Sequence, residues 1–227
     1  MLRPEHKLAL YLEGAWGKPE AKMAYGILRY SPNPVACILD SQHAGRRTTR
    51  PGIEAPPVPI VASFEEAVQA GAQVLVLGTA TSGGRIPEAW FAPLQQAVNL
   101  GLSVVNGMHD RLAGRWPLTG PEQWVWDVRT EPIGLGIACR RAMDLRARRV
   151  LFVGTDMAVG KMTAALELDR QARGRGVRSA FVATGQTGIC IHGRGVALDA
   201  VRVDYAAGAV EVAVLACPED AEVIWVE

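Results

Sequence analysis

One segment constrains the fold of this chain more than any other, the strand, glycine loop and helix start within residues 149–163. Residues 150–153 are all apolar and rich in β-branched side chains, which predicts a buried strand. The chain then turns at Gly154, and good helix formers follow Gly160 and Lys161. Such a loop directs backbone N–H groups and a helix N-terminus at one point, where Lys161 adds a positive charge. The segment therefore predicts a phosphate-binding loop, or P-loop.

The loop departs from the common P-loop pattern in two places. Five residues, Thr155 to Val159, separate its glycines, where the common form has four. Met162 stands where a Mg²⁺-binding hydroxyl is usual, and the nearest hydroxyl is that of Thr163. The spacing resembles that of dethiobiotin synthetase and its P-loop relatives. The alternative is a glycine turn with an incidental lysine. The scarcity of lysine in this chain argues against that alternative.

The predicted phosphate contacts share one property, a position in the loop or in the first turn of the helix that follows it. They are Gly154, Thr155, Asp156, Met157, Ala158, Val159, Gly160, Lys161, Met162 and Thr163.

Composition excludes several classes of partner. The net charge of the 227 residues is +1, which gives no electrostatic basis for binding nucleic acid or a membrane surface. No apolar run approaches the ~20 residues of a membrane span, and the N-terminus does not resemble a signal peptide. The four cysteines have neither zinc-site nor Cys-x-x-Cys spacing, so we expect reduced thiols in a cytoplasmic protein.

Strand and helix patterns alternate along the chain, which predicts an α/β fold with parallel sheets. We expect a Rossmann-like domain over residues 1–135, a linker over 136–148 and a P-loop domain over 149–227. A second glycine-rich strand, loop and helix, residues 74–100, lacks a lysine. Its glycines either permit a turn or expose N–H groups to a substrate carboxylate or phosphate.

Three further predictions concern polar segments. The loop 40–47 is either a solvated connection or an anion contact at a strand end. Residues 196–216 are predicted to be helical. Asp199 and Asp204 would lie ~140° apart around that helix, so they are not an obvious carboxylate pair and each is equally well a solvated carboxylate.

A family resemblance combines these motifs. Residues 154–161, 183–188 and 199–209 resemble the P-loop domain of the D-glutamate N-acetyltransferase-like family, long known only as a domain of unknown function. Residues 78–87 and 107–109 resemble motifs of the Rossmann-like N-terminal domain of that family. The resemblance covers nearly the whole chain and implies an N-terminal Rossmann-like parallel sheet followed by a P-loop NTPase-like α/β domain.

The sequence departs from the family at its last residue. In the family the final strand continues as Glu-Gly-Gln-Gly, whereas this sequence ends at Glu227. We therefore expect an incomplete P-loop domain in a C-terminally truncated chain. A carboxylate at this strand end is where such folds hold Mg²⁺ or its water.

The first functional hypothesis is transfer of acetyl from acetyl-CoA to the amino group of an acidic D-amino acid. Lys161 and neighbouring amides would hold the CoA phosphates, and Asp156 would act as a base or orient the substrate ammonium. Gln186 and Thr187 would hold the substrate or the oxyanion, and Arg85 would clamp a carboxylate. The resemblance also puts Asp199 and Asp204 on the substrate side.

Two other hypotheses remain. A Mg-ATP-dependent ligase or kinase would use Thr163 and Glu227 for the metal and Lys161 for the transferred phosphoryl group. A nucleotide- or CoA-binding module without turnover is the third. The cofactor is thus either acetyl-CoA or Mg-ATP, and we expect a small-molecule substrate, no nucleic acid or membrane partner, and a homo-oligomer.

Overall fold

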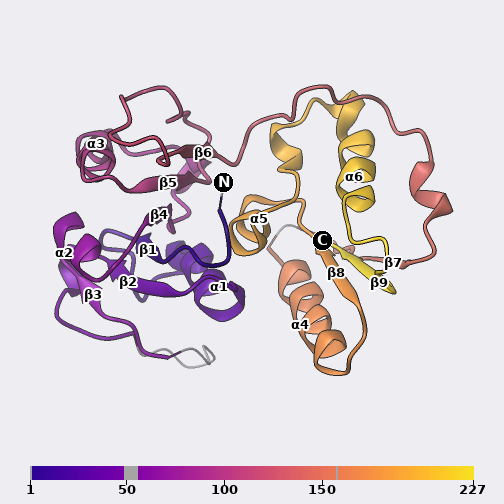
Figure 1. The fold of residues 1–227 in the computed structure, drawn as a ribbon, viewed down its shortest axis with the longest axis horizontal. Helices are drawn as coiled ribbons and strands as arrows, with labels where there is room; N and C mark the ends of the chain where they lie inside the picture. The colour runs from indigo at the N-terminus through magenta and orange to yellow at the C-terminus, as the bar shows by residue number, and fades with distance from the viewer. Residues whose placement is uncertain (1, 49–55, 157) are drawn as a thin grey trace. The chain divides into compact units, whose positions relative to one another are not determined.

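The chain forms two compact units, Met1–Val128 and Arg129–Glu227. The computed structural model describes residues 2–48, 56–156 and 158–227 and is shown in Figure 1. The division falls a few residues before the boundary that the sequence suggests at 135. Arg129 and Glu131 already belong to the second unit, where they form ion pairs with Asp199 and Arg202.

The first unit is built on a six-stranded parallel sheet in the order β3-β2-β1-β4-β5-β6. Its strands are β1 (Leu8–Tyr11), β2 (Val35–Leu39), β3 (Ile60–Val61), β4 (Val74–Leu77), β5 (Ser103–Asn106) and β6 (Val125–Asp127). This is the strand order of the Rossmann fold, so the expected fold class is confirmed. The order reverses between β1 and β4, and ligands of open α/β sheets bind at the carboxyl ends of strands near that point.

Among the residues described, three α-helices accompany this sheet, and each buries apolar residues. They are α1 (Lys22–Tyr30), α2 (Phe64–Gln69) and α3 (Phe91–Asn99). Phe64 of α2 and Leu94 of α3 belong to one apolar cluster with Tyr11 of β1 and Leu75 of β4. Short 3₁₀ helices cover Pro19–Ala21, Ser41–His43, Ser82–Gly84 and Glu88–Trp90.

The start of α2 follows directly from its sequence. The Ser63 hydroxyl accepts a 3.2 Å hydrogen bond from the Glu66 N–H, and the Glu66 carboxylate accepts one of 2.9 Å from the Ala62 N–H. Each bond gives an acceptor to a backbone N–H group for which the helix itself offers none, as in a capping box. The Ser-x-x-Glu pattern of residues 63–66 therefore accounts for the start of α2.

The second unit contains a three-stranded parallel sheet in the order β7-β9-β8. Its strands are β7 (Arg148–Leu151), β8 (Ser179–Val182) and β9 (Val223–Val226), and its helices are α4 (Lys161–Gly174), α5 (Gln186–His192) and α6 (Ala206–Leu215). Short 3₁₀ helices occupy Arg141–Asp144, Leu198–Ala200 and Val203–Tyr205. The core of this unit includes Ala180, Val182, Val214 and Ile224.

The prediction of a buried strand before the P-loop is wrong in its burial. All four residues of β7 are exposed, and so is Val153 after it, at 79%. β7 is an edge strand that pairs, within the described part of the chain, with β9 alone. An apolar sequence shows that a strand can be buried, but its position in the sheet decides whether it is.

Two helix predictions in the second unit also need correction. Residues 196–216 are α-helical only over Ala206–Leu215, because the Val196 and Leu198 N–H groups donate to the carbonyls of Ala183 and Thr184 instead of a helix. Residues 186–188, for which the sequence suggested no helix, begin α5. A Cβ at Gly188 would lie 2.8 Å from the Ala183 Cβ, so this glycine permits close packing of α5 on the end of β8.

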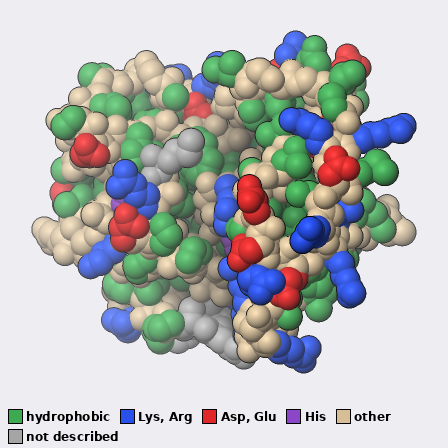
Figure 2. Space-filling view, turned by 45° about the vertical axis from the view of Figure 1, so that its right-hand side comes forward, with side chains coloured by type: hydrophobic (Ala, Val, Ile, Leu, Met, Phe, Trp, Pro, Cys, Tyr) green, Lys and Arg blue, Asp and Glu red, His purple; other side chains and the backbone are tan. Residues whose placement is uncertain are grey.

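The surface carries charges of both signs. Figure 2 shows Lys or Arg and Asp or Glu side chains interspersed on the face that it presents, in keeping with a net charge of +1. In the ranges that the structure describes, no helix has the length and apolar character needed to cross a membrane.

Candidate functional site

The P-loop connects the end of β7 with the start of α4, as the sequence predicts. Two of its residues have left-handed backbone conformations, Ala158 with φ +56° and Gly160 with φ +101°. Met157, one of the predicted phosphate contacts, lies outside the described residues. The other residues from Gly154 to Gly160 are exposed, so the loop is open to a ligand from solution.

Gly154 brings the lysine back across the loop. A Cβ at this position would lie 2.9 Å from Cγ2 of Val159 and 3.2 Å from Cδ of Lys161. The Lys161 side chain passes through the space that a larger residue would fill, and its Nζ donates a 2.6 Å hydrogen bond to the carbonyl oxygen of Asp156. The ammonium is thus held over the loop by a neutral acceptor, which an anion would outcompete.

Glu227 lies at the carboxyl end of β9, the central strand of this sheet. Its N–H donates to the Val182 carbonyl, and its own carbonyl accepts from the Thr184 hydroxyl. Its side-chain Oε2 is buried and has no hydrogen-bond partner in the described part of the chain. Burial raises the pKa of Glu227, while the N–H groups of Thr184 and Gly185 and the charge of Lys161 act in the opposite direction.

Gln186 and Thr187 occupy the first turn of α5, immediately after β8. Both are partly buried. Because β7, β9 and β8 are parallel, their carboxyl ends meet at one edge of the sheet. That edge therefore collects the P-loop, Glu227 and the Gln186–Thr187 pair.

Of the three other predicted substrate residues, two form ion pairs and one is exposed. Arg85 belongs to the first unit, where its guanidinium forms a 2.7 Å ion pair with Asp110. Asp199 forms a 2.6 Å ion pair with Arg129. Asp204 is exposed on the 3₁₀ helix Val203–Tyr205.

The predicted metal residues differ in their surroundings. Thr163 is exposed in the first turn of α4, whereas Glu227 is partly buried. No group of three or more His, Cys, Asp or Glu side chains suited to a metal occurs among the residues described. A P-loop offers backbone N–H groups to a ligand, and here the Lys161 ammonium adds a charged donor, both of which suit phosphate oxygens.

Sequence reasoning missed the role of Thr184. Its hydroxyl holds the carbonyl of Glu227 and so ties the end of β9 to the segment between β8 and α5. The residue lies inside the recognised motif 183–188, but a hydroxyl that serves a residue 43 positions away leaves no pattern in the sequence. Only the pairing of β8 with β9 reveals the contact.

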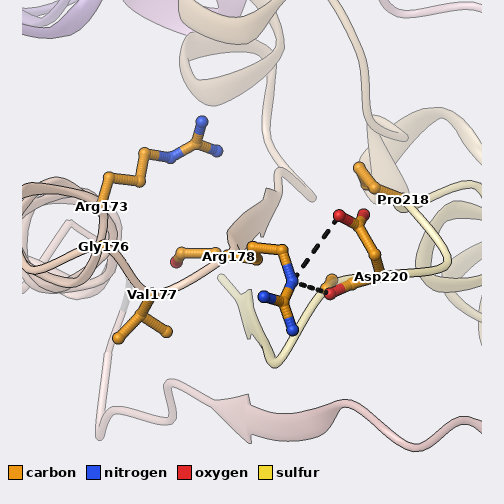
Figure 3. A pocket seen from close by; sticks show the side chains of 8 residues that line it. Arg173, Gly176, Val177, Arg178, Pro218 and Asp220 are labelled. Carbon is orange, nitrogen blue, oxygen red and sulfur yellow. Dashed lines mark hydrogen bonds and ion pairs between the residues drawn. The ribbon is translucent and has the colours of Figure 1, made fainter.

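A cavity of about 340 Å³ lies at the opposite edge of the same sheet, at the start of β8 (Figure 3). Its Arg178 Nε donates to the Asp220 carbonyl at 2.7 Å and lies 3.6 Å from the Asp220 carboxylate. Arg173, also in the lining, is paired with Asp169. Since these cations already have carboxylate partners, the cavity is a poorer anion site than the P-loop.

Comparison with known sequences identifies two domains. Residues 41–131 match the family described as "Domain of unknown function (DUF1611_N) Rossmann-like domain". Residues 136–227 match "Domain of unknown function (DUF1611_C) P-loop domain". Both matches agree with the two units of the structure.

Two curated relatives are named D-glutamate N-acetyltransferase. The relative from Tritonibacter scottomollicae is 38% identical over 206 residues, which are 89% of this chain and 59% of the relative. The relative from a Pseudoalteromonas species is 36% identical over 153 residues, 66% of this chain and 46% of that protein. The chain thus spans about three fifths or less of the curated relatives that it matches.

A solved structure shares the fold. The crystal structure of a DUF1611 family protein from Anabaena variabilis superposes with a TM-score of 0.89 at 44% identity, over 98% of this chain and 66% of that one. The chain belongs to the DUF1611 family and carries its N-terminal Rossmann-like domain and its C-terminal P-loop domain.

Proposed function

We propose that the P-loop of this chain binds the phosphates of acetyl-CoA, and that the chain takes part in acetyl transfer to the amino group of an acidic D-amino acid such as D-glutamate. Two relatives that carry the name D-glutamate N-acetyltransferase support this choice of reaction. The chain spans 59% of the relative from Tritonibacter scottomollicae, so the activity is proposed for it by analogy.

The observation that carries the proposal is the arrangement of Gly154, Asp156 and Lys161. The glycine leaves room for the lysine stem, and the ammonium hydrogen-bonds to a neutral carbonyl in an exposed loop. A phosphate oxygen is a stronger acceptor for an ammonium than a carbonyl, so the loop is prepared for an anion. The diphosphate and 3′-phosphate of CoA supply such oxygens, and Met162 leaves no hydroxyl beside the lysine for a metal.

Acetyl transfer to an amine needs a group that takes the proton of the substrate ammonium. Glu227 suits this role better than the exposed Asp156, because burial raises the pKa of its carboxyl and makes it a stronger base. Gln186 and Thr187, at the same sheet edge, are candidates to donate to the oxygen on which negative charge develops. Acetyl-CoA, when bound, supplies the activated acyl group.

The test combines binding and turnover. Isothermal titration of the chain with acetyl-CoA is compared for wild type, Lys161→Ala and the control Lys18→Ala, an exposed lysine of the first unit. We expect Lys161→Ala alone to weaken binding. Release of the CoA thiol in the presence of D-glutamate, with L-glutamate as control, then measures transfer.

A Mg-ATP-dependent ligase is the second candidate, and Glu227 is the observation that favours it. Its buried Oε2 has no partner among the residues described, and its carboxyl interacts electrostatically with Lys161, as expected of a carboxylate that faces a metal-bound nucleotide. Incubation with Mg-ATP and D-glutamate distinguishes the two reactions. Substrate-dependent release of ADP supports the ligase, whereas thiol release from acetyl-CoA supports the transferase. Tight binding of either compound without turnover would instead support the third hypothesis, a binding module without catalytic activity.

A further inference from the structure

A second cavity, of about 420 Å³, is formed entirely by residues of the first unit. It opens at the carboxyl ends of β1, β2 and β3, beside the starts of α2 and α3. This is the edge at which open α/β sheets bind their ligands. Its size is within the range of small-molecule sites.

Tyr11, the last residue of β1, lines this cavity. The residue is 2% exposed, and its ring packs against Trp90 and Phe64 at centroid distances of 4.8 and 5.6 Å. Its hydroxyl forms no hydrogen bond with any residue that the structure describes. A tyrosine hydroxyl at the wall of a cavity is available to hydrogen-bond with a molecule that occupies the cavity.

Glu13 places a carboxylate next to this hydroxyl. Its Oε1 accepts a 2.6 Å hydrogen bond from the Ser41 hydroxyl, and its Oε2 accepts one of 3.3 Å from the Ser41 N–H. The carboxylate is close enough to Tyr11 to raise the pKa of the phenol further, in addition to the larger effect of burial. The phenol therefore stays neutral and keeps its proton.

Glu65 adds a second carboxylate to the lining, where it accepts a 2.7 Å hydrogen bond from Gln96. The described residues that line the cavity include no Lys, Arg or His. The resulting negative potential disfavours phosphates and carboxylates, and hence both CoA and D-glutamate. The ligand must instead be neutral or cationic and must donate hydrogen bonds.

Asp40 gives a reason not to assign a dinucleotide here. An acidic residue after the second strand commonly binds the ribose in Rossmann folds. Asp40 is fully buried, and its carboxylate accepts hydrogen bonds of 2.9 and 3.0 Å from the N–H groups of Gly14 and Trp16. Its oxygens thus hold the loop after β1 in place.

We propose that this cavity binds a small organic cation, a primary ammonium on an apolar body. The ammonium donates to the Glu13 carboxylate and to the Tyr11 hydroxyl oxygen, and the body packs against Trp90 and Phe64. Aromatic rings beside a carboxylate are a common arrangement for an organic cation, because ring faces and carboxylate both attract positive charge. The cavity belongs to the first unit and the P-loop to the second, and the two would take ligands of opposite charge.

The first experiment compares three probes that share one apolar body. The full chain is titrated with 2-phenylethylamine, 2-phenylethanol and 3-phenylpropionate at neutral pH, by ligand-observed NMR or calorimetry. We expect saturable binding of the amine, at least about fivefold weaker binding of the alcohol, and none of the carboxylate. Equal binding of amine and alcohol, or no saturable binding of the amine at millimolar concentration, would overturn the proposal.

The second experiment assigns the binding to these residues. Glu13→Gln keeps the shape and removes the charge, and we expect it to weaken binding of the amine about fivefold or more. Glu122→Gln, at an exposed position of the same unit, is the matched control and should leave binding unchanged. Unchanged affinity in Glu13→Gln would refute the assignment, and Glu65→Gln provides an independent variant if that protein fails to fold.

Tyr11→Phe separates a binding role from a structural one. The hydroxyl has no described partner, so its removal should leave the melting temperature unchanged or slightly higher while it weakens amine binding about threefold. A lower melting temperature with unchanged affinity would show that the hydroxyl serves the fold and would contradict the proposal.

Discussion

The ammonium of Lys161 donates a hydrogen bond of 2.6 Å to the carbonyl oxygen of Asp156, five residues earlier in the same loop. The lysine that would neutralise a ligand phosphate is thus held by a neutral acceptor of the loop itself. An arriving phosphate can compete with the Asp156 carbonyl for the Lys161 ammonium, because the described residues of the loop are exposed. This geometry is the basis of the proposal that the loop binds an anion.

Gly154→Ala should weaken acetyl-CoA binding about tenfold. The new Cβ would lie 2.9 Å from Val159 Cγ2 and 3.2 Å from Lys161 Cδ, so either the loop or the lysine must shift. The melting temperature should change little, because the loop is exposed and contributes little to the core. Calorimetric titration measures the affinity. Gly174→Ala, at a position with nothing within 4 Å, is the control, and equal affinities in both variants would refute the role of Gly154.

Glu227→Gln should stabilise the protein at neutral pH. Burial raises the pKa of this carboxyl, so the folded state binds its proton more tightly than the unfolded state does. The wild type therefore loses stability as the pH rises from about the ordinary pKa of 4.5 through the raised value. The amide cannot ionise, so the two proteins should differ in stability at pH 7 and converge near pH 4.

Urea unfolding of both proteins at several pH values measures this difference. A constant difference across the range would show that the carboxyl of Glu227 has an ordinary pKa in the folded protein. Loss of acetyl transfer in the same variant, with acetyl-CoA affinity retained, would agree with the proposed role of Glu227 as the base.

Asp199→Asn distinguishes a structural from a substrate role. The carboxylate forms a 2.6 Å ion pair with Arg129, whose side chain is 10% exposed. We expect a loss of about 1 kcal/mol in unfolding free energy and no change in the KM for D-glutamate. An increased KM without any loss of stability would restore the substrate role that the family resemblance implies.

Leu151→Lys should reduce self-association of the chain. Leu151 is 64% exposed on β7, which pairs on one side only within the described residues. Unpaired edge strands with apolar side chains promote pairing with another chain, and a lysine opposes it. Sedimentation velocity over a range of concentrations measures the effect. A monomeric wild type, or an unchanged oligomer in the variant, would contradict the expected homo-oligomer.

Local sequence signals identified the main elements of the fold because each depends on nearby residues. The capping residues Ser63 and Glu66 marked the start of α2, and the Gly-Lys pair marked the start of α4. Strand patterns and helix patterns alternate along the chain, which predicted parallel sheets. The pairing of the strands confirms this prediction.

Features that depend on distant residues could not be predicted. The exposure of β7 follows from its place in the sheet, and the missed helix α5 depends on how Gly188 packs against Ala183. The ion pair of Asp199 with Arg129 and the contact of Thr184 with Glu227 join residues 70 and 43 positions apart. None of these features produces a periodic pattern or a short motif that can be read from a single sequence.

The central claim is that the loop from Gly154 to Lys161 binds the phosphates of a CoA thioester. Its most direct test is the dissociation constant of acetyl-CoA for wild type and Lys161→Ala, measured by calorimetry at fixed ionic strength, with Lys18→Ala as control. We predict at least about tenfold weaker binding for Lys161→Ala alone, because a charged hydrogen bond to phosphate is lost. Equal dissociation constants for all three proteins would contradict the claim.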